Sequence, residues 1–102
     1  MWPPKNLDQQ DRPVIALPAD LTHEVAAGLA LDLKRQVQLQ PGEVVADASV
    51  LQTFDSSALA VLLACRREAL AAGKTFSVQG LAPRLRQLAT LYGVAELVPP
   101  TP

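Results

Sequence analysis

Two adjacent hydroxyl groups, those of Ser56 and Ser57, follow Asp55 directly and open the most apolar stretch of the chain. Asp and Ser are typical residues at a helix N-terminus, because their side-chain oxygens accept the amide N–H groups that the first turn leaves unpaired. A hydroxyl at this positively polarised end can also bond to a partner or carry a phosphate. The 55–57 turn is therefore both a structural cap and the most distinctive candidate for a binding or switch site.

The residue patterns typical of enzymes are missing from the sequence. The single histidine, His23, lies far along the chain from the serines, and neither serine stands in a G-x-S-x-G turn. No glycine-rich phosphate-binding motif occurs, and the acidic residues are scattered rather than spaced as metal ligands. The single cysteine, Cys65, lies in an apolar run and is expected to be a small core residue. We therefore expect a protein that is not an enzyme and that uses no metal and no cofactor.

The composition argues for one small domain without polyanionic partners. The chain has 102 residues, and its 9 Lys and Arg balance 10 Asp and Glu, so no strong positive field is available to attract nucleic acid. No signal peptide and no apolar run of about 18 residues is visible, so we expect no direct membrane insertion. The lone cysteine fits a reducing compartment, and a cytoplasmic location is expected.

Proline divides the chain into a central domain and two extensions. Residues 1–13 and 99–102 are rich in proline, and we expect a flexible N-terminal segment and a fraying tail around a domain that spans 14–98.

Within 14–98, strand and helix patterns alternate three times. Strands are expected at 14–17, 43–48 and 75–79, the second central because it lacks alternation and the third half exposed. Thr22 is expected to cap the first helix, Asp55 or Ser56 the second, and Pro83 to open the third. The order predicts an α/β fold with a mixed, mostly parallel sheet and helices packed against it.

The apolar residues predict which face of each helix is buried. The expected core stripes are Val25, Leu29, Leu33 and Val37; Leu59, Leu62, Leu63 and Leu70; and Leu85, Leu88 and Tyr92. The second helix is apolar all round between residues 58 and 65, which leaves Ala60, Val61 and Ala64 facing a flank or solvent. A flat surface of small residues beside the 55–57 turn suits the close approach of another protein.

Several segments of the chain together resemble a STAS domain. They are Asp47 at the end of the central strand, the F-D-S-S-A-L turn at 54–59, A-A-G-K at 71–74, V-Q-G-L at 78–81 and L-Y-G-V at 91–94. The resemblance covers roughly 14–98, and the D-S-S-x-L turn is its sharpest motif. It implies the small α/β fold of that family, which normally has one more strand before residue 14.

Two branches of this family imply different partners. In anti-sigma factor antagonists the residue matching Ser57 is phosphorylated by an anti-sigma factor kinase. In the STAS subunits of Mla phospholipid transporters, which maintain outer-membrane lipid asymmetry, the hydroxyl matching Ser56 contacts the ABC ATPase. Ala58 stands where both branches usually have glycine, which opposes the close approach of a kinase loop and favours the transporter branch.

The resemblance therefore implies a subunit that binds the ATPase of an ABC transporter and, through it, a permease in the inner membrane. The alternative is an antagonist switched by phosphorylation of Ser57 or Ser56. The expected partner-binding residues are Thr53, Phe54, Asp55, Ser56, Ser57, Ala60, Ala64 and Arg67.

Overall fold

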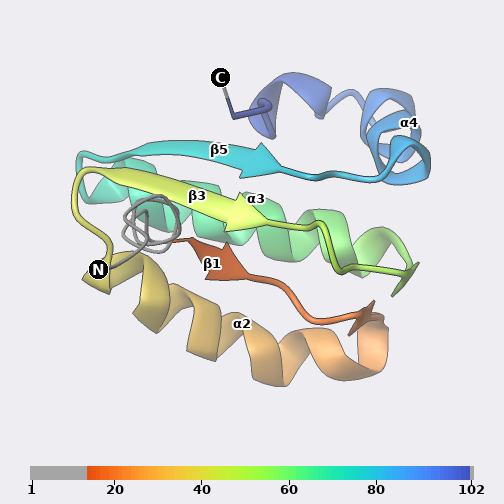
Figure 1. Ribbon diagram of the computed structural model, residues 1–102, viewed down its shortest axis with the longest axis horizontal. Coiled ribbons are helices and arrows are strands. Elements are labelled where there is room, and N and C mark those ends of the chain that lie inside the picture. Colours follow the sequence, from red (N-terminus) through yellow and green to blue (C-terminus); the bar gives the residue numbers. More distant parts are fainter. Residues whose placement is uncertain (1–13, 102) are drawn as a thin grey trace, which may run out of the picture.

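The computed structural model describes residues 14–101 of the chain (Figure 1). The prediction of a flexible segment at 1–13 lies outside the described residues, as does the place where the STAS resemblance would put the family's additional strand. The elements are β1 (Ile15–Ala16), β2 (Asp20–Leu21), α2 (His23–Leu39), β3 (Glu43–Asp47), β4 (Thr53–Phe54), α3 (Ser56–Ala71), β5 (Thr75–Gln79), α4 (Pro83–Leu91) and a 3-10 turn, η1 (Ala95–Leu97).

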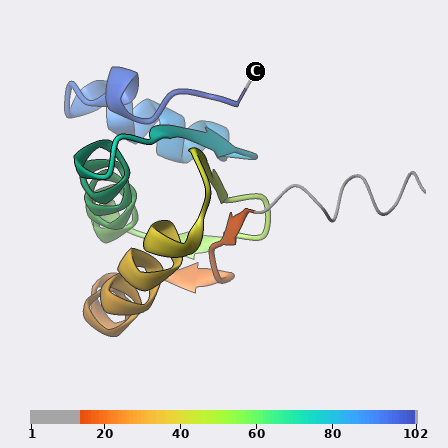
Figure 2. The same cartoon turned by 90° about the vertical axis from the view of Figure 1, so that its left-hand side faces the viewer.

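The main sheet has the order β1-β3-β5, and its strand pairs are parallel. The expected α/β architecture is confirmed, and so is the central place of β3. Helices α2 and α3 lie side by side on one face of this sheet (Figure 2). The strand residues that belong to the core on that face are Ile15, Val44, Ala46, Phe76 and Val78. Each parallel connection passes through a helix, as the strand geometry requires.

A second, very short sheet was not expected from the sequence. Strands β2 and β4 pair in parallel, and the Ala19 carbonyl accepts the N–H groups of Gln52 and Thr53 at 2.8 and 2.9 Å. Each of these two-residue strands ends one residue before a helix begins, since Thr22 caps α2 and Asp55 caps α3. The pairing therefore places the N-termini of α2 and α3 next to each other. Two residues are too few to give a periodic signal.

Three residues that were expected in the core are exposed. Val25 is 40% exposed because a spacing of four residues rotates by about 40° at each step of a helix with 3.6 residues per turn. The first turn of α2 instead packs Ala26 against the core. Leu70 is 47% exposed because Ala69 takes the buried position, and Tyr92 is 56% exposed because it is the C-cap of α4.

Val61, by contrast, is more buried than the sequence predicts. The side chain was expected to face a flank, but it is buried. Helix α3 is covered by the sheet on one side and by α2 on another, so it buries more than one stripe. The buried residues of α3 are Ala58, Leu59, Val61, Leu62, Cys65 and Ala69.

The C-terminal segment pairs with β5 rather than fraying. Val78 donates its N–H to the Pro99 carbonyl at 2.8 Å, and its own carbonyl accepts the N–H of Thr101 at 3.1 Å. The hydroxyls of Ser77 and Thr101 also lie 3.1 Å apart. The predictions of a half-exposed third strand and of a fraying tail are therefore both wrong for these residues. The tail covers Ser77, which is only 8% exposed.

The other end of α2 is held by a lysine that follows α3. The Lys74 ammonium donates to the carbonyls of Val37 and Gln38 at 2.9 and 3.1 Å. These carbonyls belong to the last turn of α2, where the helix is negatively polarised and the regular helical amide partners run out. The Val37 carbonyl also accepts the N–H of Gln40 at 3.2 Å. The two long helices are thus joined at their C-terminal ends by a cation.

The loops after β3 and β5 meet at a position that only glycine fits. Gly80 has a φ of 71°, and a Cβ at this position would stand 2.7 Å from the Cβ of Ser49 and 2.9 Å from its Cα. Ser49 cannot move freely, because its N–H donates to the Asp47 carboxylate at 3.0 Å.

Two glycine substitutions are therefore predicted to change stability in opposite directions. Gly80→Ala should lower the free energy of unfolding by about 2–4 kcal/mol, the sum of the left-handed backbone and the overpacking. Gly28→Ala, in the middle of α2 with no atom within 4 Å of the added Cβ, should raise it by about 0.5–1 kcal/mol. Urea unfolding measures both, and a Gly80→Ala variant as stable as the parent chain would contradict the packing of these loops.

Candidate functional site

One carboxylate, that of Asp55, bonds to the N-termini of two helices. Its Oδ1 accepts the N–H of Ser57 in the first turn of α3 at 2.9 Å, and its Oδ2 accepts the N–H of His23, the first residue of α2, at 3.0 Å. The prediction of Asp55 as the cap of α3 is confirmed. Thr22 occupies the capping position of α2, but its side chain makes no capping hydrogen bond, so Asp55 supplies that oxygen.

These two bonds stabilise the charged form of Asp55. The amide of Ser57 and then that of His23 lower the pKa of this carboxyl below its ordinary value of 3.8. A lowered pKa in the folded state means that the carboxylate contributes to stability above the unfolded-state value. This contribution is lost as the pH falls through the folded-state pKa.

The two candidate hydroxyls lie at the same end of α3 but are not equivalent. Ser56 is the first residue of the helix and is exposed, whereas Ser57 is half-buried beside α2. Both hydroxyls lie near the positively polarised N-termini of α2 and α3. The neighbouring Asp55 carboxylate neutralises part of this positive charge. The site can donate or accept hydrogen bonds through both hydroxyls.

A shallow groove runs from these serines between α2 and α3. It has a volume of about 310 Å³. Four of its lining residues come from α2 and four from α3, and five of the eight are alanines: His23, Ala26, Ala27, Ala30, Ser57, Ala60, Val61 and Ala64. The predicted surface residues Ala60 and Ala64 both lie here, exposed and half-buried respectively.

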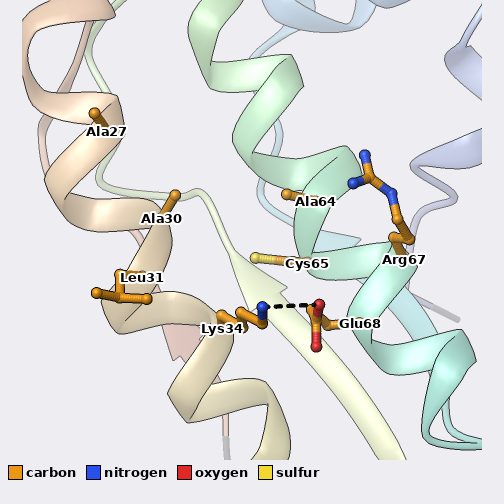
Figure 3. Close-up of a pocket in the computed structure, with 8 residues that line it drawn as sticks. All are labelled: Ala27, Ala30, Leu31, Lys34, Ala64, Cys65, Arg67 and Glu68. Carbon is orange, nitrogen blue, oxygen red and sulfur yellow. Dashed lines mark ion pairs between the residues drawn. The ribbon is translucent and has the colours of Figure 1, made fainter.

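The groove continues into a second hollow of about 420 Å³ further along the two helices. Figure 3 draws the residues that line it, which are Ala27, Ala30, Leu31 and Lys34 of α2 and Ala64, Cys65, Arg67 and Glu68 of α3. Lys34 and Glu68 form an ion pair across the hollow at 3.6 Å, with 52% and 30% of their side chains exposed. An exposed pair of this kind adds little stability, so the hollow can open to a partner at low cost.

Cys65 is not a nucleophile in this site. Burial, together with the negative charge of Glu68, raises the pKa of the Cys65 thiol to about 11. The thiolate is therefore scarce at neutral pH, and the expectation of a small core residue is confirmed.

On the other side of the turn lies a cleft that we name the α4 cleft. It has a volume of about 440 Å³ and is lined by Phe54, Asp55, Arg84, Gln87, Leu88 and Leu91. The Arg84 guanidinium lies over the ring of Phe54, 5.3 Å from its centroid, which is the geometry of a cation–π interaction.

The predicted site residues lie at the start of α3 and along it: Thr53, Phe54, Asp55, Ser56 and Ser57 at or just before its N-terminus, then Ala60, Ala64 and Arg67 progressively further along the helix. Thr53 is exposed in β4, and Arg67 is exposed beside the second hollow. The sequence reasoning missed the α2 half of the groove and the α4 cleft. The available signal for the first was the group of alanines at 26, 27 and 30, since small residues at helical spacing allow close approach.

The described residues hold no group of three or more His, Cys, Asp or Glu that could bind a metal ion. Within the same part of the chain, no helix is long and apolar enough to cross a membrane.

We predict that Asp55→Asn lowers stability at neutral pH, because the amide has one acceptor oxygen for two helix N-termini and carries no charge. The difference from the parent chain should be constant above about pH 5 and should shrink as the pH falls below the ordinary carboxyl value of 3.8. Thermal unfolding measured from neutral to acidic pH tests this. Asp32→Asn, an exposed carboxylate on α2, is the control, and equal effects of the two substitutions would contradict the double cap.

Comparison with protein families gives one match. The family model described as "Mlab, STAS domain" matches residues 6–99 of the chain. The match begins inside the segment that composition sets apart at 1–13 and ends at the first residue of the C-terminal tail. No curated protein matches the chain.

Proposed function

Because this chain belongs to the MlaB-type STAS domain family, we propose that it is a non-enzymatic subunit that binds the ATPase of an Mla-type phospholipid ABC transporter. The family match is the observation that carries this proposal. STAS domains in general act in regulation and interaction rather than catalysis, and the site described above holds binding groups without a catalytic arrangement.

The groove between α2 and α3 supports a protein as the partner. Its walls are mostly alanine, so a partner's helix or loop can approach the two backbones closely and exclude water. A protein that docks here needs only a surface whose shape complements the groove. Burying exposed alanines also costs little conformational entropy, because an alanine side chain has almost no rotational freedom to lose.

The serines add hydroxyl groups to this apolar surface, and these groups can form directional hydrogen bonds to a partner. Ser56 is exposed at the start of α3, next to Ser57, and its hydroxyl can donate to a carbonyl or carboxylate of the partner. Ser57 lines the groove itself. We assign Ser56 to the ATPase contact and expect Ser57 to contribute less.

In this proposal the chain is cytoplasmic and reaches the inner membrane only through the ATPase and its permease. Docking across the ends of two helices would stabilise or regulate the active ATPase assembly, and outer-membrane lipid asymmetry would be the process served.

The partner can be tested by co-expression with the ABC ATPases of the same genome, followed by affinity capture. We expect an ATPase to be captured, and we expect Ala60→Glu to abolish capture because a carboxylate would be buried without a counter-charge. Leu39→Glu is the matched control, since Leu39 is 78% exposed on α2 and lies outside the groove.

The hydroxyls separate the two branches of the family. Ser56→Ala should weaken binding by about 1–3 kcal/mol, the cost of leaving a buried acceptor unpaired, while Ser57→Ala should have little effect. Binding titrations with the captured ATPase and the intact mass of chain purified from its native cells provide the readouts. Recovery of a serine kinase with a phosphate on Ser57 would contradict the transporter proposal and establish the anti-sigma factor antagonist.

A further inference from the structure

The α4 cleft lies outside the groove but at the same end of the molecule. Figures 1 and 2 place α3 between α2 and α4, so the groove and the cleft flank the first turn of α3 on two different sides. The groove shares no lining residue with the cleft. A partner that covers Ser56 can therefore reach both surfaces.

The cleft combines the apolar side chains of Phe54, Leu88 and Leu91 with the guanidinium of Arg84. Arg84 makes no ion pair with any residue between 14 and 101. Asp55 lines the same cleft, but each of its oxygens accepts a helix amide, from Ser57 or from His23. The Phe54 ring under the guanidinium holds the cation in place without neutralising it.

The spacing along α4 is typical of a docking face. Arg84, Gln87, Leu88 and Leu91 follow one another at i, i+3, i+4 and i+7, which places them on one side of the helix. Leu91 is 76% exposed at the end of this face. Covering it would remove a large apolar area from water.

We propose that the α4 cleft is a second contact for the same partner, and that it binds a segment carrying a carboxylate beside an apolar side chain. The carboxylate would pair with Arg84 and the apolar side chain would pack on Leu88 and Leu91. A guanidinium suits this role because it can bond a carboxylate through two parallel N–H groups and stack on an aromatic ring at the same time. Since Phe54 already orders Arg84, less side-chain freedom is lost on binding.

This inference rests on the proposed function, and its test uses the ATPase captured by the parent chain. Arg84→Gln should weaken binding about 10- to 100-fold, because the partner's carboxylate would be buried without its counter-charge. Arg35→Gln, which removes an exposed positive charge from α2, is the control and should leave affinity within about twofold. Thermal unfolding of both variants verifies that the fold is retained.

Photo-crosslinking identifies the occupant. A photoreactive residue at Gln87 should crosslink to an ATPase peptide that contains Asp or Glu within a few residues of the crosslinked site. The same residue placed at Leu39 should give no crosslink to the ATPase.

Three outcomes decide the proposal. Weaker binding of Arg84→Gln together with an acidic crosslinked peptide supports it. If Arg84→Gln binds like Arg35→Gln while Ala60→Glu still loses capture, the cleft contact is wrong and the transporter function stands. If the parent chain captures no ATPase, both proposals fall together.

Discussion

The geometry of this end of the molecule depends on one carboxylate. Asp55 bonds to the first amide of α2 and to an amide in the first turn of α3, and the short β2–β4 pairing brings the two helix N-termini within its reach. Two positive helix ends would otherwise repel each other and leave several amides unpaired. The negative charge of Asp55 stabilises both positive helix ends. The amides of Ser57 and His23 at these ends in turn lower the pKa of its carboxyl. The groove exists because the two helices start side by side at this residue.

The same constraint explains why α3 is so apolar. The helix is packed against the sheet and against α2, and its N-terminal end lies beside α4. Its large side chains fill the core, while alanines occupy the seam with α2 and keep the groove shallow and open. The polar groups at its N-terminal end are those of Asp55, Ser56 and Ser57, and its charged residues, Arg66, Arg67 and Glu68, lie in the second half. In the proposed complex, this arrangement would let a chain of 102 residues present two contact areas, the groove and the α4 cleft.

Much of the fold could be predicted because long elements leave strong local signals. The lack of alternation at 43–48 indicated the centre of the sheet, and of the two caps expected for α3, Asp55 and Ser56, Asp55 is the one observed. The errors have tertiary causes. Val61 is buried because two elements cover α3, and Ser77 is buried because the C-terminal tail pairs with β5.

The candidate site could be predicted only on one side. Residues 53–67 form a continuous stretch, so the turn and the outward alanines of α3 were visible in the sequence. The α2 wall of the groove and Arg84 come from distant parts of the chain, and only the helix packing shows that they meet the turn. Amide hydrogen exchange of the chain, alone and with the ATPase bound, is the most direct test of the central claim. We predict slower exchange at 23–30, 56–64 and 84–91, and protection confined to β1 or to the C-terminal segment would contradict it.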